Sequence, residues 1–343
     1  MIRPAHKRAT IVDIAHRLGL SAMTVSRALN NKPEVGEETR QKVLRCATLL
    51  GYQPDRWARS LVTRRSSIIG VVIPDISHSY FAEITFGVEE VLDKAGYDIL
   101  LCHSRGDSGK EKSEIDMLVG SRVAGLIVAS EQPEKSAATF KELENKAIPF
   151  VLVDRFFPGS EFPSVRVDDV AVGRLGTQCL IDFGHKHIVH IRGPALSPAS
   201  FRFRGYEEAL KRARIPLRKD WIAVGNFDIE SGKQAMAKLL KCHPRPTGVF
   251  AGNDPMAIGA VYACREAGLH VPEDVSIVGA GNIEGQYHPN PFVTTLDWPR
   301  QELGRIAAAL LLASITGETR REATVKIFDP TLLIRQSTTR PPS

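Results

Sequence analysis

The chain has 343 residues, a length that predicts two or three domains. Hydrophobic residues make up 43% and charged residues 24%, which is typical of a soluble globular protein and excludes a mainly disordered or fibrous chain. The longest apolar run, residues 306–317, is shorter than the roughly 18 residues that a membrane-spanning helix needs, and residues 1–10 lack the apolar run of a secretory signal. The five cysteines are odd in number and far apart. We therefore expect a cytoplasmic protein without a disulfide framework, metal site or cofactor.

Charge is distributed unevenly along the chain. Residues 1–65 hold 13 Lys and Arg against 5 Asp and Glu, a net charge of +8, whereas residues 66–343 have a net charge of −2. A basic head on a near-neutral body indicates an anionic polymer as the partner of the head. Charge alone leaves a second interpretation open, a solvated basic N-terminal tail.

The pattern within this head predicts three short helices. Thr10 caps the first, residues 11–18, in a predicted capping box. Ser21 caps the second, whose apolar face holds Val25, Ala28 and Leu29. The third spans residues 37–50, with an apolar stripe of Val43, Leu44, Ala47 and Leu50. Only residues 19–21 separate the first two helices, which is the short glycine-containing turn of a helix-turn-helix.

Five stretches of the sequence resemble the LacI-type family of bacterial transcription regulators. They follow the family's order and spacing: residues 10–15 (TIVDIA), 20–30 (LSAMTVSRALN), 35–40 (VGEETR), 50–54 (LGYQP) and 58–61 (ARSL). The resemblance implies a helix-turn-helix DNA-binding domain over residues 8–53 and a hinge helix and linker over residues 54–65. It implies a two-lobed effector-binding and dimerisation domain over residues 66–343. Gly36 departs from the family pattern, which usually has a side-chain cap there.

By the same resemblance, the second helix is the recognition helix, which lies in the major groove. Ala22, Met23 and Arg27 are then the base-reading positions: the first two offer only apolar contact, and Arg27 can bond to guanine O6 and N7. An alternative for Met23 is that it fills a gap in the core. Phosphate contacts, which set register rather than sequence, suit Thr24, Ser26 and Asn30. The full set of DNA-binding candidates is Thr10, Ser21, Ala22, Met23, Thr24, Ser26, Arg27, Asn30 and Leu61.

The hinge segment predicts a helix that is not stable alone. Pro54 favours a first helical turn, and Trp57 and Leu61 share a face, but isolated helices below roughly 12–15 residues are marginal in water. In the family this helix pairs with its dimer mate in the minor groove, where Leu61 would wedge between base pairs. The hinge positions are Trp57, Ala58 and Leu61, and Trp57 is bulkier than the small aliphatic residue that the family pattern has. The alternative is an ordinary linker.

From residue 66 onward, short apolar strands alternate with amphipathic helices. Strands are predicted at residues 68–74, 97–102, 125–130, 150–154, 187–192, 248–251 and 275–279, and a helix at 81–95. This alternation predicts parallel sheets covered on both faces, and the number of strands predicts two doubly wound lobes. The layout resembles periplasmic sugar-binding proteins. That likeness implies passages between the lobes near residues 168, 296 and 325, and a ligand cleft between them.

The candidate effector-binding residues follow from the strand ends and the resemblance: Tyr80, Phe81, Asp168, Arg202, Phe227, Asn253, Asp254 and Trp298. The resemblance makes Arg202 the effector clamp and Phe227 a ring that stacks on the ligand. A buried arginine can hold a carboxylate, a phosphate or vicinal hydroxyls, but each of these residues could instead serve a structural ion pair or the core. Gly281 stands where the family has an effector-binding acid, and Trp298 replaces a polar residue. A sugar or sugar acid is the favoured effector, and a nucleoside or purine comes next.

Other functional classes fit less well. Residues 279–285 superficially suggest a dinucleotide fingerprint, but the glycine spacing is one residue too long and the following prolines cannot open a helix. His185, His187 and His190 suggest a metal site, but strand alternation separates the last two. We therefore expect no enzyme. The prediction is a homodimeric, effector-responsive regulator, a repressor, that binds a near-palindromic operator and no membrane. The alternative is a solute-binding protein without a DNA function.

Overall fold

The computed structural model describes residues 9–52, 66–77, 79–283, 290–318 and 325–342. The chain divides into two compact units, residues 1–66 and residues 67–343. The predicted hinge positions, Trp57, Ala58 and Leu61, lie outside the described residues.

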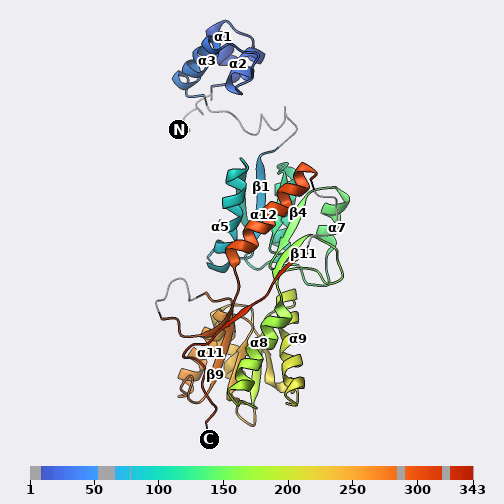
Figure 1. Cartoon of the computed structure of the whole chain (residues 1–343), viewed down its shortest axis with the longest axis vertical. Helices are drawn as coiled ribbons and strands as arrows, with labels where there is room; N and C mark the ends of the chain where they lie inside the picture. Colours follow the sequence, from blue (N-terminus) through green and yellow to red (C-terminus); the bar gives the residue numbers. More distant parts are fainter. Residues whose placement is uncertain (1–8, 53–65, 78, 284–289, 319–324, 343) are drawn as a thin grey trace, which may run out of the picture. The chain divides into compact units, whose positions relative to one another are not determined.

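The head unit contains the helices α1 (Ile11–Leu18), α2 (Ala22–Leu29) and α3 (Glu37–Leu49), which enclose a small apolar core (Figure 1). The capping box is present, because the Thr10 hydroxyl accepts from the Asp13 amide and the Asp13 carboxylate accepts from the Thr10 amide. Gly19 ends α1 with a φ of 63°, a conformation that favours glycine. One position of the predicted α3 stripe is wrong: Leu44 is 40% exposed, and Cys46 is buried instead.

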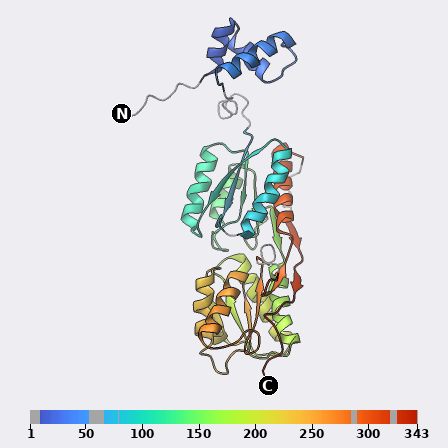
Figure 2. The ribbon, with the colours of Figure 1, turned by 90° about the vertical axis from the view of Figure 1, so that its left-hand side faces the viewer.

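The N-terminal lobe of the body has a six-stranded parallel sheet in the order β11-β5-β4-β3-β1-β2. The strands are β1 (Ile68–Ile73), β2 (Asp98–His103), β3 (Gly125–Val128), β4 (Phe150–Val153), β5 (Ser164–Val167) and β11 (Val325–Phe328). Helices α5 (Ser79–Lys94) and α12 (Arg300–Thr316) pack on one face, and α6 (Ser108–Gly120) and α7 (Ala138–Asn145) on the other (Figures 1 and 2). Both faces are buried, which explains the near-continuous apolar strands.

The C-terminal lobe repeats this arrangement with the strand order β12-β10-β9-β8-β6-β7, and only β12 runs antiparallel to its neighbour. Its strands are β6 (Ile188–Arg192), β7 (Ile222–Val224), β8 (Gly248–Ala251), β9 (Ser276–Ala280), β10 (Thr294–Asp297) and β12 (Thr331–Leu333). Helices α8 (Asp169–Asp182) and α9 (Ser197–Arg212) cover one face of the sheet, and α10 (Ile229–Leu239) and α11 (Asp254–Glu266) cover the other. A short 3-10 turn, η1 (Lys219–Trp221), precedes β7.

Within the described residues, the chain passes between the lobes after Val167, between Asp297 and Arg300, and between Phe328 and Thr331. The third passage lies beyond the expected position near residue 325, because β11 still pairs with β5 of the first sheet. The predicted fold class is confirmed: a helical head and an α/β body of two doubly wound lobes. None of the helices in the described ranges is both long and apolar enough to cross a membrane.

Candidate DNA-reading helix and inter-lobe cavity

Helix α2 presents the candidate base-reading side chains to solvent. Ala22, Met23 and Arg27 are exposed, whereas Val25 and Ala28 are buried in the head core. Met23 is 64% exposed, so it does not fill a gap in the core. Met23 in the first turn of α2 and Arg27 in its last turn lie four residues apart, so they form one exposed face that can enter a groove.

The other predicted DNA-binding side chains of the head make local hydrogen bonds. The Ser21 and Thr24 hydroxyls lie 2.8 Å apart, and Ser21 also accepts from the Thr24 amide at the start of α2. The side-chain amide of Asn30 donates from Nδ2 to the Ser26 carbonyl at 2.8 Å and so supports the C-terminal end of the helix. Thr10 is engaged in its capping box. These contacts hold the start of α1 and both ends of α2 in place. Arg27 remains exposed on α2.

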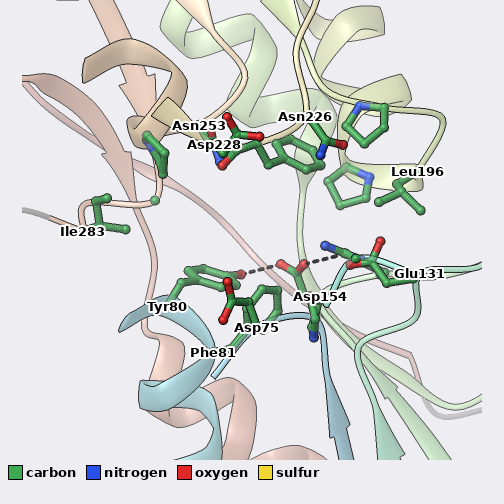
Figure 3. A pocket seen from close by; sticks show the side chains of 18 of the residues that line it. Asp75, Tyr80, Phe81, Glu131, Asp154, Leu196, Asn226, Asp228, Asn253 and Ile283 are labelled. Carbon is green, nitrogen blue, oxygen red and sulfur yellow. Dashed lines mark hydrogen bonds and ion pairs between the residues drawn. The ribbon is translucent and has the colours of Figure 1, made fainter. Parts of the chain in front are cut away.

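A cavity of about 820 Å³ lies in the body between the carboxyl ends of the strands of the two lobes. Figure 3 shows Asp75, Tyr80 and Asp154 on one side of it and Asn226 and Asn253 on the other. Of the predicted effector-binding residues, the lining includes Tyr80, Phe81, Arg202, Phe227, Asn253 and Trp298. The topology therefore brings together side chains that are far apart in the sequence.

Two predicted residues, Asp168 and Asp254, do not line the cavity. Asp168 is the N-cap of α8 and accepts from the Ala171 amide at 3.0 Å. Asp254 is buried and accepts from the Thr295 hydroxyl at 2.7 Å and from the Ile283 amide at 2.9 Å. Both carboxylates therefore hold the backbone around the cavity in place.

Arg202 of α9 is held in a buried ion pair. Its Nε donates to Oδ1 of Asp169 at 2.8 Å, and its Nη1 donates to the Gly252 carbonyl at 2.6 Å. Its guanidinium carbon lies 5.3 Å from the centre of the Trp298 ring. Burial raises the pKa of the Asp169 carboxyl to about 6, and the guanidinium opposes that rise. These two hydrogen bonds fix the Arg202 side chain, which lines the cavity. Its Nη2 has no hydrogen-bond partner among the described residues.

A second network joins Trp298 to the N-terminal lobe. The Trp298 Nε1 donates to Tyr80 Oη at 3.1 Å, and Tyr80 Oη donates to Asp154 Oδ1. Burial, followed by the neighbouring Asp154 charge, raises the pKa of Tyr80 well above its ordinary value, so the phenol stays protonated. Asp154 has a φ of 67°, a strained conformation for an aspartate. The network thus positions Trp298 as an aromatic wall of the cavity.

Several cavity-lining residues were not predicted from the sequence. They include Asp75, His103, Arg105, Glu131, Asp154, Arg155, Asn226 and Asp228. Most follow the ends of β1, β2, β3 and β4, so the rule that parallel strands end at one edge of a sheet could have found them. Arg155 donates from Nη1 to Glu131 Oε1 at 2.6 Å, and behind it the buried Glu111 accepts from the Ser130 hydroxyl at 2.8 Å.

Gly281, which was predicted to stand where the family has an effector-binding acid, also lines the cavity. Its φ of 116° favours glycine, and its carbonyl accepts from Arg300 Nη1 at 2.6 Å. A Cβ at this position would meet nothing closer than the Ile283 side chain at 3.9 Å. This part of the wall is therefore formed by backbone.

The three histidines that suggest a metal site make other contacts. His185 bonds to the Thr247 hydroxyl and the Thr339 carbonyl, and His187 packs edge-on against Trp221. His190 is fully buried and stacks on Phe250. The residues that the structure describes contain no group of three or more His, Cys, Asp and Glu that could hold a metal ion.

Comparison with known protein families separates the chain into the same two parts. Residues 10–55 match the profile described as "Bacterial regulatory proteins, lacI family". Residues 66–335 match the profile of "Periplasmic binding proteins and sugar binding domain of LacI family". The two profiles correspond to the helical head and the two-lobed body.

Curated relatives cover nearly the whole chain. The HTH-type transcriptional repressor PurR of Photorhabdus laumondii is 36% identical over 332 residues, which is 96% of either chain. The catabolite control protein A of Priestia megaterium is 33% identical over 312 residues, 90% of this chain and 93% of the relative. These relatives carry the names of transcription regulators and not of enzymes.

Solved structures give the same result. The lac repressor dimer bound to operator and the anti-inducer ONPF superposes with a TM-score of 0.85 at 26% identity, covering 97% of this chain and all of that one. The transcriptional regulator CelR in complex with cellobiose has a TM-score of 0.72 at 30% identity, covering 96% of this chain and all of that one. Together with the two profile matches, these relatives show that the chain belongs to the lacI family of bacterial regulatory proteins and is a DNA-binding transcriptional regulator with an effector-binding body.

Proposed function

We propose that the chain is a cytoplasmic, homodimeric repressor whose affinity for a near-palindromic operator changes when a neutral sugar binds in the inter-lobe cavity. Residues 8–53 would read the operator, residues 54–65 would form the hinge, and residues 66–343 would dimerise and bind the effector. The repressor names of the relatives support the sign of regulation.

The observation that supports a neutral sugar most strongly is the balance of charges in the cavity wall. The lining contains four carboxylates, those of Asp75, Glu131, Asp154 and Asp228. They stand against three guanidinium groups, of which Arg155 is paired with the lining Glu131 and Arg202 with Asp169, and the third belongs to Arg105. Sugar hydroxyls can donate to carboxylates and accept from a fixed guanidinium, whereas a sugar acid would bring another anion to an acid-rich wall.

Aromatic side chains complete the case for a ring-shaped ligand. Tyr80, Phe81, Phe227 and Trp298 all line the cavity. Apolar ring faces pack against the C–H faces of a sugar, while the polar groups fix its orientation. The same rings favour a nucleoside as the second candidate, because a base can stack on them.

The proposed DNA contacts follow from the exposed face of α2. Met23 would make apolar contact with a base such as thymine, and Arg27 would bond to a guanine edge. Thr10, Ser21, Thr24, Ser26 and Asn30 would lie near the phosphates, and Leu61 of the hinge would enter the minor groove.

Exposed apolar side chains on the C-terminal lobe support a homodimer. Val224 is 66% exposed at the end of β7, and Ile229 and Tyr262 are 43% and 45% exposed on the neighbouring helices α10 and α11. Exposed apolar side chains on a folded domain are typical of association surfaces, although Ile229 also lines the cavity. Two copies give twofold symmetry, and therefore two operator half-sites about one helical turn apart.

The proposal is tested in two steps with the full-length chain. Selection of bound fragments from a random DNA pool should yield a near-palindrome, and Arg27→Ala should relax one base position in each of its half-sites. A thermal-shift screen over neutral sugars, sugar acids and nucleosides then identifies the effector class, and a gel shift with the selected operator measures its effect. Absence of sequence-selective retardation would instead favour a solute-binding protein.

A further inference from the structure

We propose that Arg300 is a positioning residue that couples the ligand-facing loop of the C-terminal lobe to helices α5 and α12 of the N-terminal lobe. Its three hydrogen bonds reach both lobes: Nε to Glu83 of α5 at 2.7 Å, and Nη1 to Asp297 at 2.8 Å and to the Gly281 carbonyl at 2.6 Å. This inference rests on the proposed function, because it assigns the path by which an occupied cavity would act on the N-terminal lobe.

The position of Arg300 is costly for the helix that carries it. It is the first residue of α12, where the positive end of the helix dipole disfavours a cation, and it is only 6% exposed. A buried guanidinium is stable only when it is paired and hydrogen-bonded. Glu83 and Asp297 supply that pairing. The arrangement therefore does not stabilise α12 locally; it ties three separate segments together.

The loop that Arg300 holds is part of the cavity wall. Gly281 and Ile283 both line the cavity. The loop amides are bonded within the C-terminal lobe: Gly281 to the Leu296 carbonyl at 2.8 Å and Ile283 to Asp254 at 2.9 Å. The Gly281 carbonyl is the group of this loop that accepts a hydrogen bond from Arg300 of the N-terminal lobe. A ligand that shifts the loop therefore acts directly on Arg300.

On the other side, Arg300 acts on a closely packed pair of helices. A Cβ at Gly87 of α5 would lie 2.0 Å from the Gln301 carbonyl oxygen, and one at Gly304 of α12 would lie 2.0 Å from that of Ile84. Backbones that approach this closely cannot slide independently. A displacement of Arg300 is thus passed to α5 and α12 together, and α5 carries Tyr80 and Phe81 at its cavity end.

The same helix pair offers a matched control. Arg305 of α12 bonds to Glu90 of α5 at 2.7 Å and to Glu302 and Gln301 of its own helix, but it lines no part of the cavity. Arg305→Gln and Glu90→Gln remove a bridge between the same two helices without touching the loop. Arg300→Gln and Glu83→Gln remove the proposed coupling.

The first measurement is amide hydrogen exchange at Gly281, Asn282 and Ile283 in the full-length protein without ligand. Glu83→Gln does not touch these residues, yet it should raise their exchange rates roughly tenfold, because Arg300 then holds the loop less firmly. Glu90→Gln should leave them unchanged. If Glu83→Gln left the loop rates equal to those of Glu90→Gln, the coupling would be disproved. A purely local structural role of Glu83 would not alter exchange in the other lobe.

The second measurement is the operator response to D-ribose, D-glucose and cellobiose, with the operator that the wild type selects. For a sugar that alters wild-type binding, Arg300→Gln should require about tenfold more sugar or lose the response, and Arg305→Gln should respond normally. Arg300→Lys keeps one charged hydrogen bond, so its response should lie between those of the wild type and Arg300→Gln. This graded response distinguishes loss of coupling from misfolding. An Arg300→Gln protein that responded like Arg305→Gln would overturn the proposal. If no sugar altered wild-type binding, the sugar assignment would fail, and the exchange measurement alone would decide the coupling.

Discussion

Arg202 and Asp169 form a buried ion pair between the second turn of α9 and the first residue of α8, with Nε and Oδ1 2.8 Å apart. Arg202 is 5% exposed and Asp169 is 1% exposed. Neither side chain can therefore lose its partner without leaving an uncompensated charge in the wall of the cavity.

Arg202→Ala should abolish the response of operator binding to the effector, because the clamp in the cavity is lost. The same change should destabilise the body by about 3–5 kcal/mol, since Asp169 remains buried without its partner. At a temperature at which the variant is folded, its operator affinity without ligand should stay close to that of the wild type.

The double variant Arg202→Ala with Asp169→Asn separates the two effects. It should regain most of the lost stability in a denaturant titration, yet still not respond to ligand. Recovery of the ligand response in the double variant would show that Arg202 acts only through the stability of the wall.

Trp298→Phe should keep an aromatic wall but lose the hydrogen bond to Tyr80, at a cost of about 1 kcal/mol in stability. Because Trp298 lines the cavity, effector binding should change the tryptophan emission of the wild type. That change should persist in Trp221→Phe, since Trp221 lies outside the cavity lining, and disappear in Trp298→Phe. An unchanged fluorescence response in Trp298→Phe would place the ligand elsewhere.

Arg27→Ala should weaken binding to the selected operator by about 1–3 kcal/mol and relax one base position in each half-site. Selection from a random pool with wild type and variant gives both results. Thr24→Ala is the control, because loss of a phosphate contact should weaken all sequences alike. An unchanged consensus for Arg27→Ala would make Arg27 a phosphate contact.

His190 should make the stability of the body depend on pH. Burial lowers the pKa of His190 to about 3, although its bond to the Phe250 carbonyl opposes this shift. The unfolded chain takes up the proton near pH 6.5 and the folded body does not, so the stabilisation is complete above that pH. It is lost as pH falls from about 6.5 towards 3, by about 1.4 kcal/mol per pH unit.

His190→Phe, which preserves the stack on Phe250, should remove this part of the pH dependence. Denaturant titrations of both proteins between pH 7 and pH 4 give the difference in slope. Because every other titrating group is common to the two proteins, equal slopes would mean that the imidazole has the same pKa in the folded and unfolded states.

Much of the head could be predicted from its sequence, because the signals that start and end its helices are local. The Thr10 capping box and the Gly19 stop are local signals, and the structure contains both. The stripe of α3 was harder to read: Leu44 and Cys46 are both apolar, and which of them packs inward depends on the angle at which α3 meets the other helices.

In the body, the strands β1 to β4, β6, β8 and β9 were predicted from the sequence, whereas β5, β7, β10, β11 and β12 were not. Strand β7 is three residues long and partly exposed, and β11 is exposed along most of its length. Segments this short carry no usable periodicity, so only their pairing in the sheet defines them.

The cavity shows the same limit at the level of single residues. Adjacent positions on a helix point about 100° apart, so the sequence could not tell that Asp169, and not Asp168, faces Arg202. The Arg155–Glu131 pair likewise depends on two loops that only the fold brings together.

Phe227 and Gly193 cannot vary independently. A Cβ on Gly193 would lie 2.3 Å from the Phe227 ring, and Phe227 itself has a φ of 63°. One added methyl group at position 193 must displace the ring that lines the cavity. A single substitution at a residue outside the lining therefore offers descendants of this gene a short mutational route to a differently shaped site, with the recognition helix left untouched.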